Sequence, residues 1–208
     1  MERFTRFTAV AAPLDLGHVD TDKLLPNRFF RKARGDGLHP YLLHDLRFNA
    51  DGSEKPDFVL NQAPYRGARI LVTGPNFGSG SAREGAVYAV ADYGFRAVIA
   101  ASFGDIYAGN MLQNGLLPVV LPEAACDSLR AQLRARPGAE ITIDLEAQAV
   151  IAPDGATHRF EIDAGAKERL VKGLDDIDLI LQHLPAIEAF EKKHWAAHPW
   201  RAPTTQGK

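Results

Sequence analysis

A glycine-rich stretch at residues 74–85 places a serine and an arginine two positions apart, at Ser81 and Arg83. Its glycines allow the backbone to turn sharply and to approach a ligand closely. The arginine carries a fork of N–H donors that suits the planar geometry of a carboxylate. These residue types in this order predict a loop that binds an anion.

The segments on either side of this loop indicate how it is held. Residues 70–73 form a short apolar, β-prone run. Residues 83–92 are rich in small apolar side chains and are followed by Gly94, which is typical of a helix and its end. The loop therefore joins a strand to a helix, and the first N–H groups and positive dipole end of that helix favour a negative charge.

The same residues also fit a purely structural role. Ser81 and Glu84 match the S-x-x-E capping box, in which the two side chains accept N–H groups at the start of a helix. The local pattern alone does not decide between a helix cap and a binding site. A nucleotide-binding loop is disfavoured, because no Gly-Lys-Ser or Gly-Lys-Thr follows the glycines and their spacing is not G-x-G-x-x-G.

The middle of the chain alternates between strand and helix patterns. In chain order, the strands and helices are expected at residues 70–73, 83–92, 97–100, 105–114 and 117–121. Such alternation indicates parallel βαβ units. Residues 140–162 instead contain short strand-like segments and a turn at Asp154-Gly155, which predicts an antiparallel part. The expected fold class is α/β, with a mixed parallel and antiparallel sheet and flanking helices.

The remaining segments suggest one domain with a tail. Residues 29–61 mix charged, aromatic and glycine residues, which predicts either a specificity-type insertion or a lid. Further helices are expected after Pro122, with Cys126 on the apolar face, and at residues 164–172 and 185–194. We expect residues 1–195 to form a single domain and residues 196–208 a flexible tail.

Composition excludes several classes of function. The 208 residues are 46% hydrophobic with a formal net charge of −2, and they contain neither a basic block nor a long apolar run. Nucleic acid and membranes are therefore not expected partners. The first residues do not resemble a signal peptide, so the expected location is the cytoplasm. Cys126 is the single cysteine, so the chain cannot hold an iron–sulfur cluster alone, and we expect no metal ligands in it.

Several segments carry a family resemblance. They comprise residues 76–84, 92–100 and 102–107, together with Val19-Asp20-Thr21-Asp22, and the similarity extends over nearly all of residues 4–195. The chain resembles the 3-isopropylmalate dehydratase small subunits of the aconitase superfamily. This implies a swivelling β/β/α domain, like the aconitase C-terminal domain, that docks on a large subunit in a heterodimer or heterotetramer. The resemblance places a [4Fe–4S] cluster on that partner and no cofactor on this chain.

The resemblance also implies roles for individual residues. The expected hydro-lyase reaction removes water from 2-isopropylmalate and adds it back at the neighbouring carbon, in leucine biosynthesis. Ser81 matches the catalytic serine, which acts as an alkoxide base, and Arg83 matches the arginine that binds a substrate carboxylate. Further substrate contacts are expected from Ser79, Gly80 and Ala82. Supporting roles are expected from Asp20, Thr21, Asp22, Asn76 and Glu84.

Some positions depart from the usual family pattern. Ser79 stands where a cysteine is usual, Ala82 where a second serine is usual, and Gly85 where a histidine is usual. These changes leave open a related hydratase for another short 2-alkylmalate or a methylated maleate. A second alternative is a non-catalytic subunit that stabilises the large subunit and whose glycine loop only caps a helix.

Overall fold

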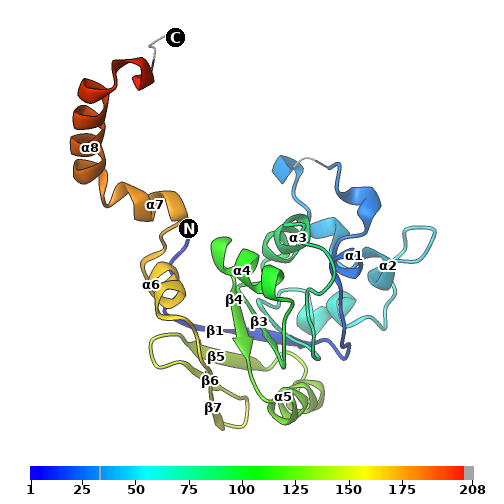
Figure 1. Cartoon of the computed structure of the whole chain (residues 1–208). Coiled ribbons are helices and arrows are strands. Elements are labelled where there is room, and N and C mark those ends of the chain that lie inside the picture. The colour runs from blue at the N-terminus through cyan, green and yellow to red at the C-terminus, as the bar shows by residue number, and fades with distance from the viewer. Residues whose placement is uncertain (33, 204–208) are drawn as a thin grey trace. The chain divides into compact units, whose positions relative to one another are not determined.

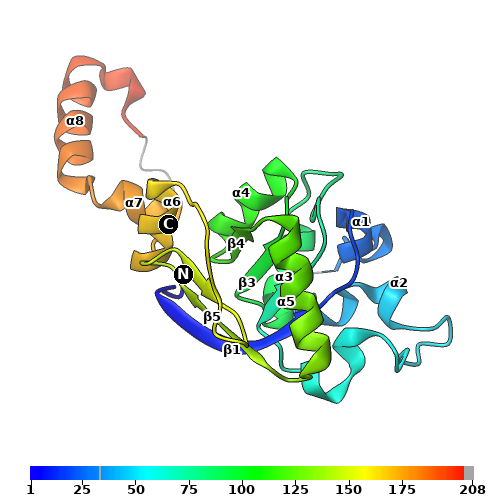
Figure 2. The same ribbon diagram turned by 90° about the horizontal axis from the view of Figure 1, so that it is seen from below.

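The structure is a computed structural model, and it describes residues 1–32 and 34–203. The chain divides into two compact units, Met1–Gly173 and Leu174–Lys208. All residues of the predicted site belong to the first unit, whose strands and helices are drawn from two directions in Figures 1 and 2.

A seven-stranded mixed sheet, in the order β4-β3-β2-β1-β5-β6-β7, forms the centre of the first unit. The strands are β1 (Arg6–Pro13), β2 (Ile70–Val72), β3 (Ala97–Ala100), β4 (Leu117–Val120), β5 (Glu140–Asp144), β6 (Ala149–Ile151) and β7 (Thr157–Arg159). Strands β1 to β4 pair in parallel, while β5 pairs antiparallel with β1 and β6, and β6 with β7. The predicted mixed sheet is confirmed.

Two helices connect the parallel strands, as the alternating pattern predicts. Helix α3 (Gly85–Tyr93) joins β2 to β3, and α4 (Asp105–Gln113) joins β3 to β4. Helix α3 ends at Gly94, which has the left-handed backbone conformation common after the last turn of a helix. It begins later than the predicted residue 83, and this difference changes the surroundings of the loop before it.

The sheet separates two hydrophobic cores, because successive side chains of a strand point to opposite faces. Leu71 of β2 packs into the core that contains α3 and α4, while Ile70 and Val72 pack into the core that contains α5 (Glu123–Ala135). Figure 1 shows α3 and α4 above the strands and α5 below them. Cys126 is fully buried on α5, as expected. Since both faces are covered, the central strands are apolar throughout.

The antiparallel half of the sheet follows α5. The predicted turn at Asp154-Gly155 lies between β6 and β7. Pairing in β7 ends at Arg159, whereas the sequence predicts a strand up to residue 162. Helix α6 (Ala164–Lys172) follows with the predicted bounds, because the Asp163 side chain caps its first turn.

The irregular segment between β1 and β2 contains only short elements in the part that the structure describes. They are α1 (Thr21–Leu24), α2 (His44–Arg47) and 3₁₀ turns at Asn27–Phe29, Arg34–Asp36, His39–Tyr41, Val59–Asn61 and Ala63–Tyr65. Buried leucines anchor the segment in the same core as α3, at Leu24, Leu25, Leu38, Leu42, Leu43 and Leu60. The segment is thus a packed part of the first unit.

One buried charge stabilises this segment. Arg47 is only 6% exposed, and it donates to the side-chain oxygen of Asn61 (3.2 Å) and to the carbonyl of Leu42 (3.3 Å). Burial lowers the pKa of Arg47, because its charge has left water for a surrounding of uncharged acceptors. The guanidinium therefore links α2 to the turn at Val59–Asn61.

The second unit contains α7 (Asp176–Leu181), α8 (Leu184–Ala197) and a 3₁₀ turn at Pro199–Arg201. Helix α8 runs through the expected domain boundary after residue 195, and residues 204–208 of the expected tail lie outside the described residues. The sequence analysis missed α7, although its capping box at Asp175 and Asp178 is a recognisable start signal. None of the described helices has the length and apolar composition needed to span a membrane.

Candidate functional site

Three loops meet at the carboxyl ends of the parallel strands β1, β2 and β3. Gly78 N donates to Val19 O (2.7 Å), and Thr21 N donates to Ser79 O (2.9 Å). In the loop after β3, Gly104 N donates to Phe77 O (2.9 Å). Open α/β sheets bind ligands at this edge. The sequence segments that carry the predicted site therefore converge in space.

The sharp turn of the glycine loop depends on Gly78. Its φ is 72°, and a Cβ atom at this position would lie 2.2 Å from the ring of Tyr107. A side chain is excluded both by the left-handed backbone and by the lack of space. Tyr107 is 2% exposed, and burial raises the pKa of its hydroxyl, so the ring acts as uncharged packing beneath the loop.

The Ser81 hydroxyl lies between two polar side chains. Arg83 Nε donates to Ser81 Oγ at 2.8 Å, and Thr21 Oγ1 lies 2.9 Å from the same oxygen. The backbone N–H of Ser81 also donates to Thr21 Oγ1, at 3.2 Å. Thr21 is 1% exposed, so this hydrogen-bonding partner is screened from water.

The Arg83 guanidinium has polar contacts at each of its nitrogens. Besides the bond to Ser81, NH1 donates to Asn27 Oδ1 (2.8 Å), and NH2 forms an ion pair with Asp22. The ring of Phe30 lies 4.2 Å from its central carbon. The sequence analysis missed Asn27 as a site residue. The signal that could have found it is its position, shortly after the Asp20-Thr21-Asp22 turn.

The start of α3 differs from the predicted helix start at residue 83 and from the predicted capping box of Ser81 and Glu84. The cap residue is Glu84, and no side chain caps the first turn. The Glu84 carboxylate accepts a hydrogen bond from Tyr88 instead. The capping box between Ser81 and Glu84 is therefore absent, and Ser81 lies before the helix. In the described residues, Arg83 and Thr21 contact its hydroxyl and the first N–H groups of α3 do not.

Other predicted site residues have different surroundings. The Asp20 carboxylate caps α1 by accepting from Lys23 N (2.7 Å). The Asn76 side chain contacts His18 Nδ1 (3.1 Å), and Gly80 and Ala82 are exposed. The structure thus brings Thr21, Asp22, Ser81 and Arg83 together, while the side chains of Asp20, Asn76 and Glu84 bond to other partners.

A hollow of about 200 Å³ lies beside the glycine loop. It is lined by Gly78, Ser79, Gly80, Ser81, Gly104, Asp105, Ile106 and Tyr107. Of the predicted substrate contacts, Ser79 and Gly80 line it, whereas Ala82 does not. Ser81 therefore lines a surface hollow while two side chains contact its hydroxyl.

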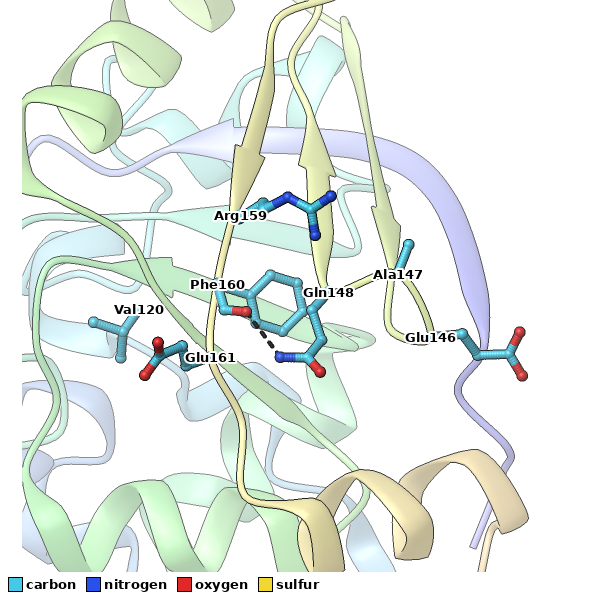
Figure 3. A pocket seen from close by; sticks show the side chains of 7 residues that line it. All are labelled: Val120, Glu146, Ala147, Gln148, Arg159, Phe160 and Glu161. Atoms are coloured by element: carbon cyan, nitrogen blue, oxygen red, sulfur yellow. Dashed lines mark hydrogen bonds between the residues drawn. The ribbon is translucent and has the colours of Figure 1, made fainter.

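A larger hollow lies elsewhere, with a volume of about 960 Å³ (Figure 3). It is lined by Val120, Glu146, Ala147, Gln148, Arg159, Phe160 and Glu161. It contains none of the predicted site residues. We call it the sheet-edge hollow, because β4 and β7 form the two edges of the sheet.

Among the described residues, no group of three or more His, Cys, Asp or Glu side chains could hold a metal ion. Cys126 is buried, and burial raises the pKa of its thiol to about 11. Such a thiol is a poor metal ligand, because the thiolate is the binding form.

Known proteins share this combination of fold and sequence. The family model for the Aconitase C-terminal domain matches residues 1–124, LeuD_N matches residues 127–164, and the model for the C-terminal domain of the 3-isopropylmalate dehydratase small subunit matches residues 176–204. A protein of Gluconacetobacter diazotrophicus named 3-isopropylmalate dehydratase small subunit is 50% identical, over 97% of both chains. The chain belongs to the 3-isopropylmalate dehydratase small-subunit family.

Other members of this family are similar over equal lengths. The small subunit of Phenylobacterium zucineum is 48% identical over 96% of this chain and 98% of its own. That of Dinoroseobacter shibae is 46% identical over 96% of this chain and 100% of its own. The resemblance found in the sequence motifs is confirmed.

A solved structure with lower sequence identity has the same fold. The crystal structure of a 3-isopropylmalate dehydratase chain from Methanocaldococcus jannaschii has a TM-score of 0.63 and 23% identity to this chain. The match covers 89% of this chain and 99% of that one. The match to the Aconitase C-terminal domain model and this shared fold together confirm the expected fold class.

Proposed function

We propose that this chain is the small subunit of a 3-isopropylmalate dehydratase, which isomerises 2-isopropylmalate to 3-isopropylmalate in leucine biosynthesis in the cytoplasm. It would act with a large subunit, as a heterodimer or heterotetramer. The observation that carries the proposal is the convergence of Arg83 Nε and Thr21 Oγ1 on the Ser81 hydroxyl, in a chain of this family.

The reaction needs a base and a Lewis acid. A [4Fe–4S] cluster held by the large subunit would supply the Lewis acid for the leaving hydroxide. On this chain the Ser81 alkoxide would take the proton from the carbon next to a carboxylate, and the electron pair of that C–H bond would form the double bond. The resulting hydroxyl would return the proton to the other carbon on rehydration.

The neighbours of Ser81 favour its charged form. Thr21 Oγ1 already accepts the N–H of Ser81, so its own hydrogen can point to Ser81 Oγ. Arg83 Nε then supplies a second donor, which carries a positive charge. Two donors aimed at one oxygen stabilise an alkoxide, more strongly when a docked partner excludes water.

Arg83 retains donors for a substrate. The contacts to Ser81, Asn27 and Asp22 use one N–H on each nitrogen, and both terminal nitrogens carry another. The side chain is 37% exposed. Its remaining donors can bind a substrate carboxylate while Asn27 and Asp22 hold its orientation. Ser79 and Gly80 would provide the wall of the site next to the serine.

The test is to co-express the chain with its large subunit and to measure kcat/KM for 2-isopropylmalate, 2-ethylmalate, 2-methylmalate and a methylated maleate. We expect the highest value for 2-isopropylmalate and no turnover by the small subunit alone. A higher value for another diacid would reassign the substrate. No conversion of any of them by a cluster-loaded complex would overturn the proposal.

A further inference from the structure

Gly85 is a glycine for reasons of space. It is the first residue of α3, and its φ lies outside the left-handed region. A Cβ atom on it would lie 2.8 Å and 3.0 Å from two carbons of the Phe30 ring and 3.2 Å from a methyl of Leu25. The ring of Phe30 therefore occupies the space that a side chain at position 85 would need.

The same ring contacts the arginine of the site. The Phe30 ring centre lies 4.2 Å from Arg83 Cζ, within the range of a cation–π interaction. Arg83 is held at its edge by Ser81, Asn27 and Asp22, and the ring adds a contact on one face. Edge contacts still allow the guanidinium plane to tilt, whereas a contact on the face opposes that motion.

We propose that Phe30 is a positioning residue for Arg83, and that the absence of a side chain at Gly85 is what admits its ring. The inference rests on the proposed function, in which Arg83 binds a substrate carboxylate. By fixing the plane of the guanidinium, Phe30 aims the remaining N–H donors at that carboxylate. The glycine at position 85 and the aromatic ring at position 30 thus act together to orient Arg83.

The neighbouring residue provides a matched control. Phe29 has the same side chain, but its ring stacks on Tyr41 at 4.3 Å and lies beside Arg28. It is not among the contacts of Arg83. Phe29→Leu should therefore disturb the local packing of the segment without changing the guanidinium plane.

The experiment is a double-mutant cycle in the assembled enzyme of both subunits, with Phe30→Leu, Gly85→Ala and the double variant. We expect each single variant to raise KM about fivefold with kcat changed less than about twofold, because each removes the same contact on the arginine. The double variant should resemble Phe30→Leu alone, since the methyl group then has no ring to displace. Phe29→Leu should leave KM within about twofold.

A second readout does not depend on activity. In the isolated small subunit, Gly85→Ala should lower the thermal unfolding midpoint when Phe30 is present. In the Phe30→Leu background it should raise the midpoint, because alanine is favoured over glycine in a helix. The same sign in both backgrounds, or additive effects on KM, would overturn the proposal. If the complex converts no alkylmalate, the unfolding cycle still tests the contact, while the proposed function fails separately.

Discussion

The hollow beside the glycine loop and the sheet-edge hollow, both in the first unit, differ in what converges on them. The hollow beside the glycine loop measures about 200 Å³, and the sheet-edge hollow about 960 Å³. The smaller one includes a serine whose hydroxyl is contacted by a threonine at the start of α1 and by an arginine of the glycine loop. Chemistry needs groups held at a defined point, so convergence identifies the site better than volume does.

Several polar groups of the sheet-edge hollow form hydrogen bonds within the fold. Gln148 Nε2 donates to Phe160 O (3.1 Å), the bond drawn in Figure 3, and Phe160 N donates to Gln148 O (3.1 Å). Lys167 Nζ donates to Glu146 O (2.8 Å) and to Gln148 Oε1 (3.0 Å). These bonds fasten the turn between β5 and β6 to the chain after β7 and to α6.

The largest expected effect that separates the two hollows comes from Ser81→Ala. If the serine is the base, kcat of the complex should fall by about two orders of magnitude or more, while complex formation is retained. The thermal unfolding midpoint should fall by about 8 °C at most, since the two lost hydrogen bonds are worth about 1 kcal/mol each. Steady-state kinetics and calorimetry on the same preparation measure both quantities.

The alternative of a non-catalytic stabilising subunit makes the opposite prediction for kcat. Ser81→Ala would then lower stability and leave kcat nearly intact. The structure already removes the capping box as a reason for such a loss of stability, because α3 begins after Glu84 without a side-chain cap.

The sequence reveals those parts of the site that depend on local pattern. Ser81 and Arg83 are close in the chain, and the βαβ units around them are apolar runs buried on both faces. Asn27 and Phe30 contact Arg83 from more than 50 positions away, through the irregular segment that no periodicity describes. The start of α3 differs from its prediction because the hydroxyl of Ser81 bonds to Thr21, a tertiary contact that a helix-capping pattern cannot include.

The next largest effect is expected at Thr21. Substitutions there test whether its hydroxyl donates to the Ser81 alkoxide or the side chain only packs. Thr21→Val keeps the shape of the side chain and removes the hydroxyl, so we expect kcat to fall about tenfold with KM little changed. Thr21→Ser restores the donor and should recover kcat to within about threefold of the original chain. Initial-rate assays at saturating substrate measure kcat of each variant.

If Thr21 has only a structural role, the kcat values of the two variants should rank differently. Serine lacks the methyl group that packs in this buried position, so Thr21→Ser would then be as harmful as Thr21→Val or worse. Equal loss of kcat in both variants would remove the threonine hydroxyl from the mechanism and leave Arg83 as the one side-chain donor to Ser81 among the described contacts.

The smallest effect is expected from substitutions in the sheet-edge hollow. They test whether this larger hollow contributes to activity. Glu161→Gln and Arg159→Gln remove two of its three charged side chains without removing the bonds of Gln148, so kcat and KM of the complex should each stay within about twofold. Surface substitutions of this kind change stability by about 0.5 kcal/mol or less. A loss of kcat/KM comparable to that of Thr21→Val would show that the larger hollow takes part in catalysis or in docking. Unchanged kinetics would mean that its volume reflects only the gap between the two edges of the sheet, where β4 and β7 have no further strand to pair with among the described residues.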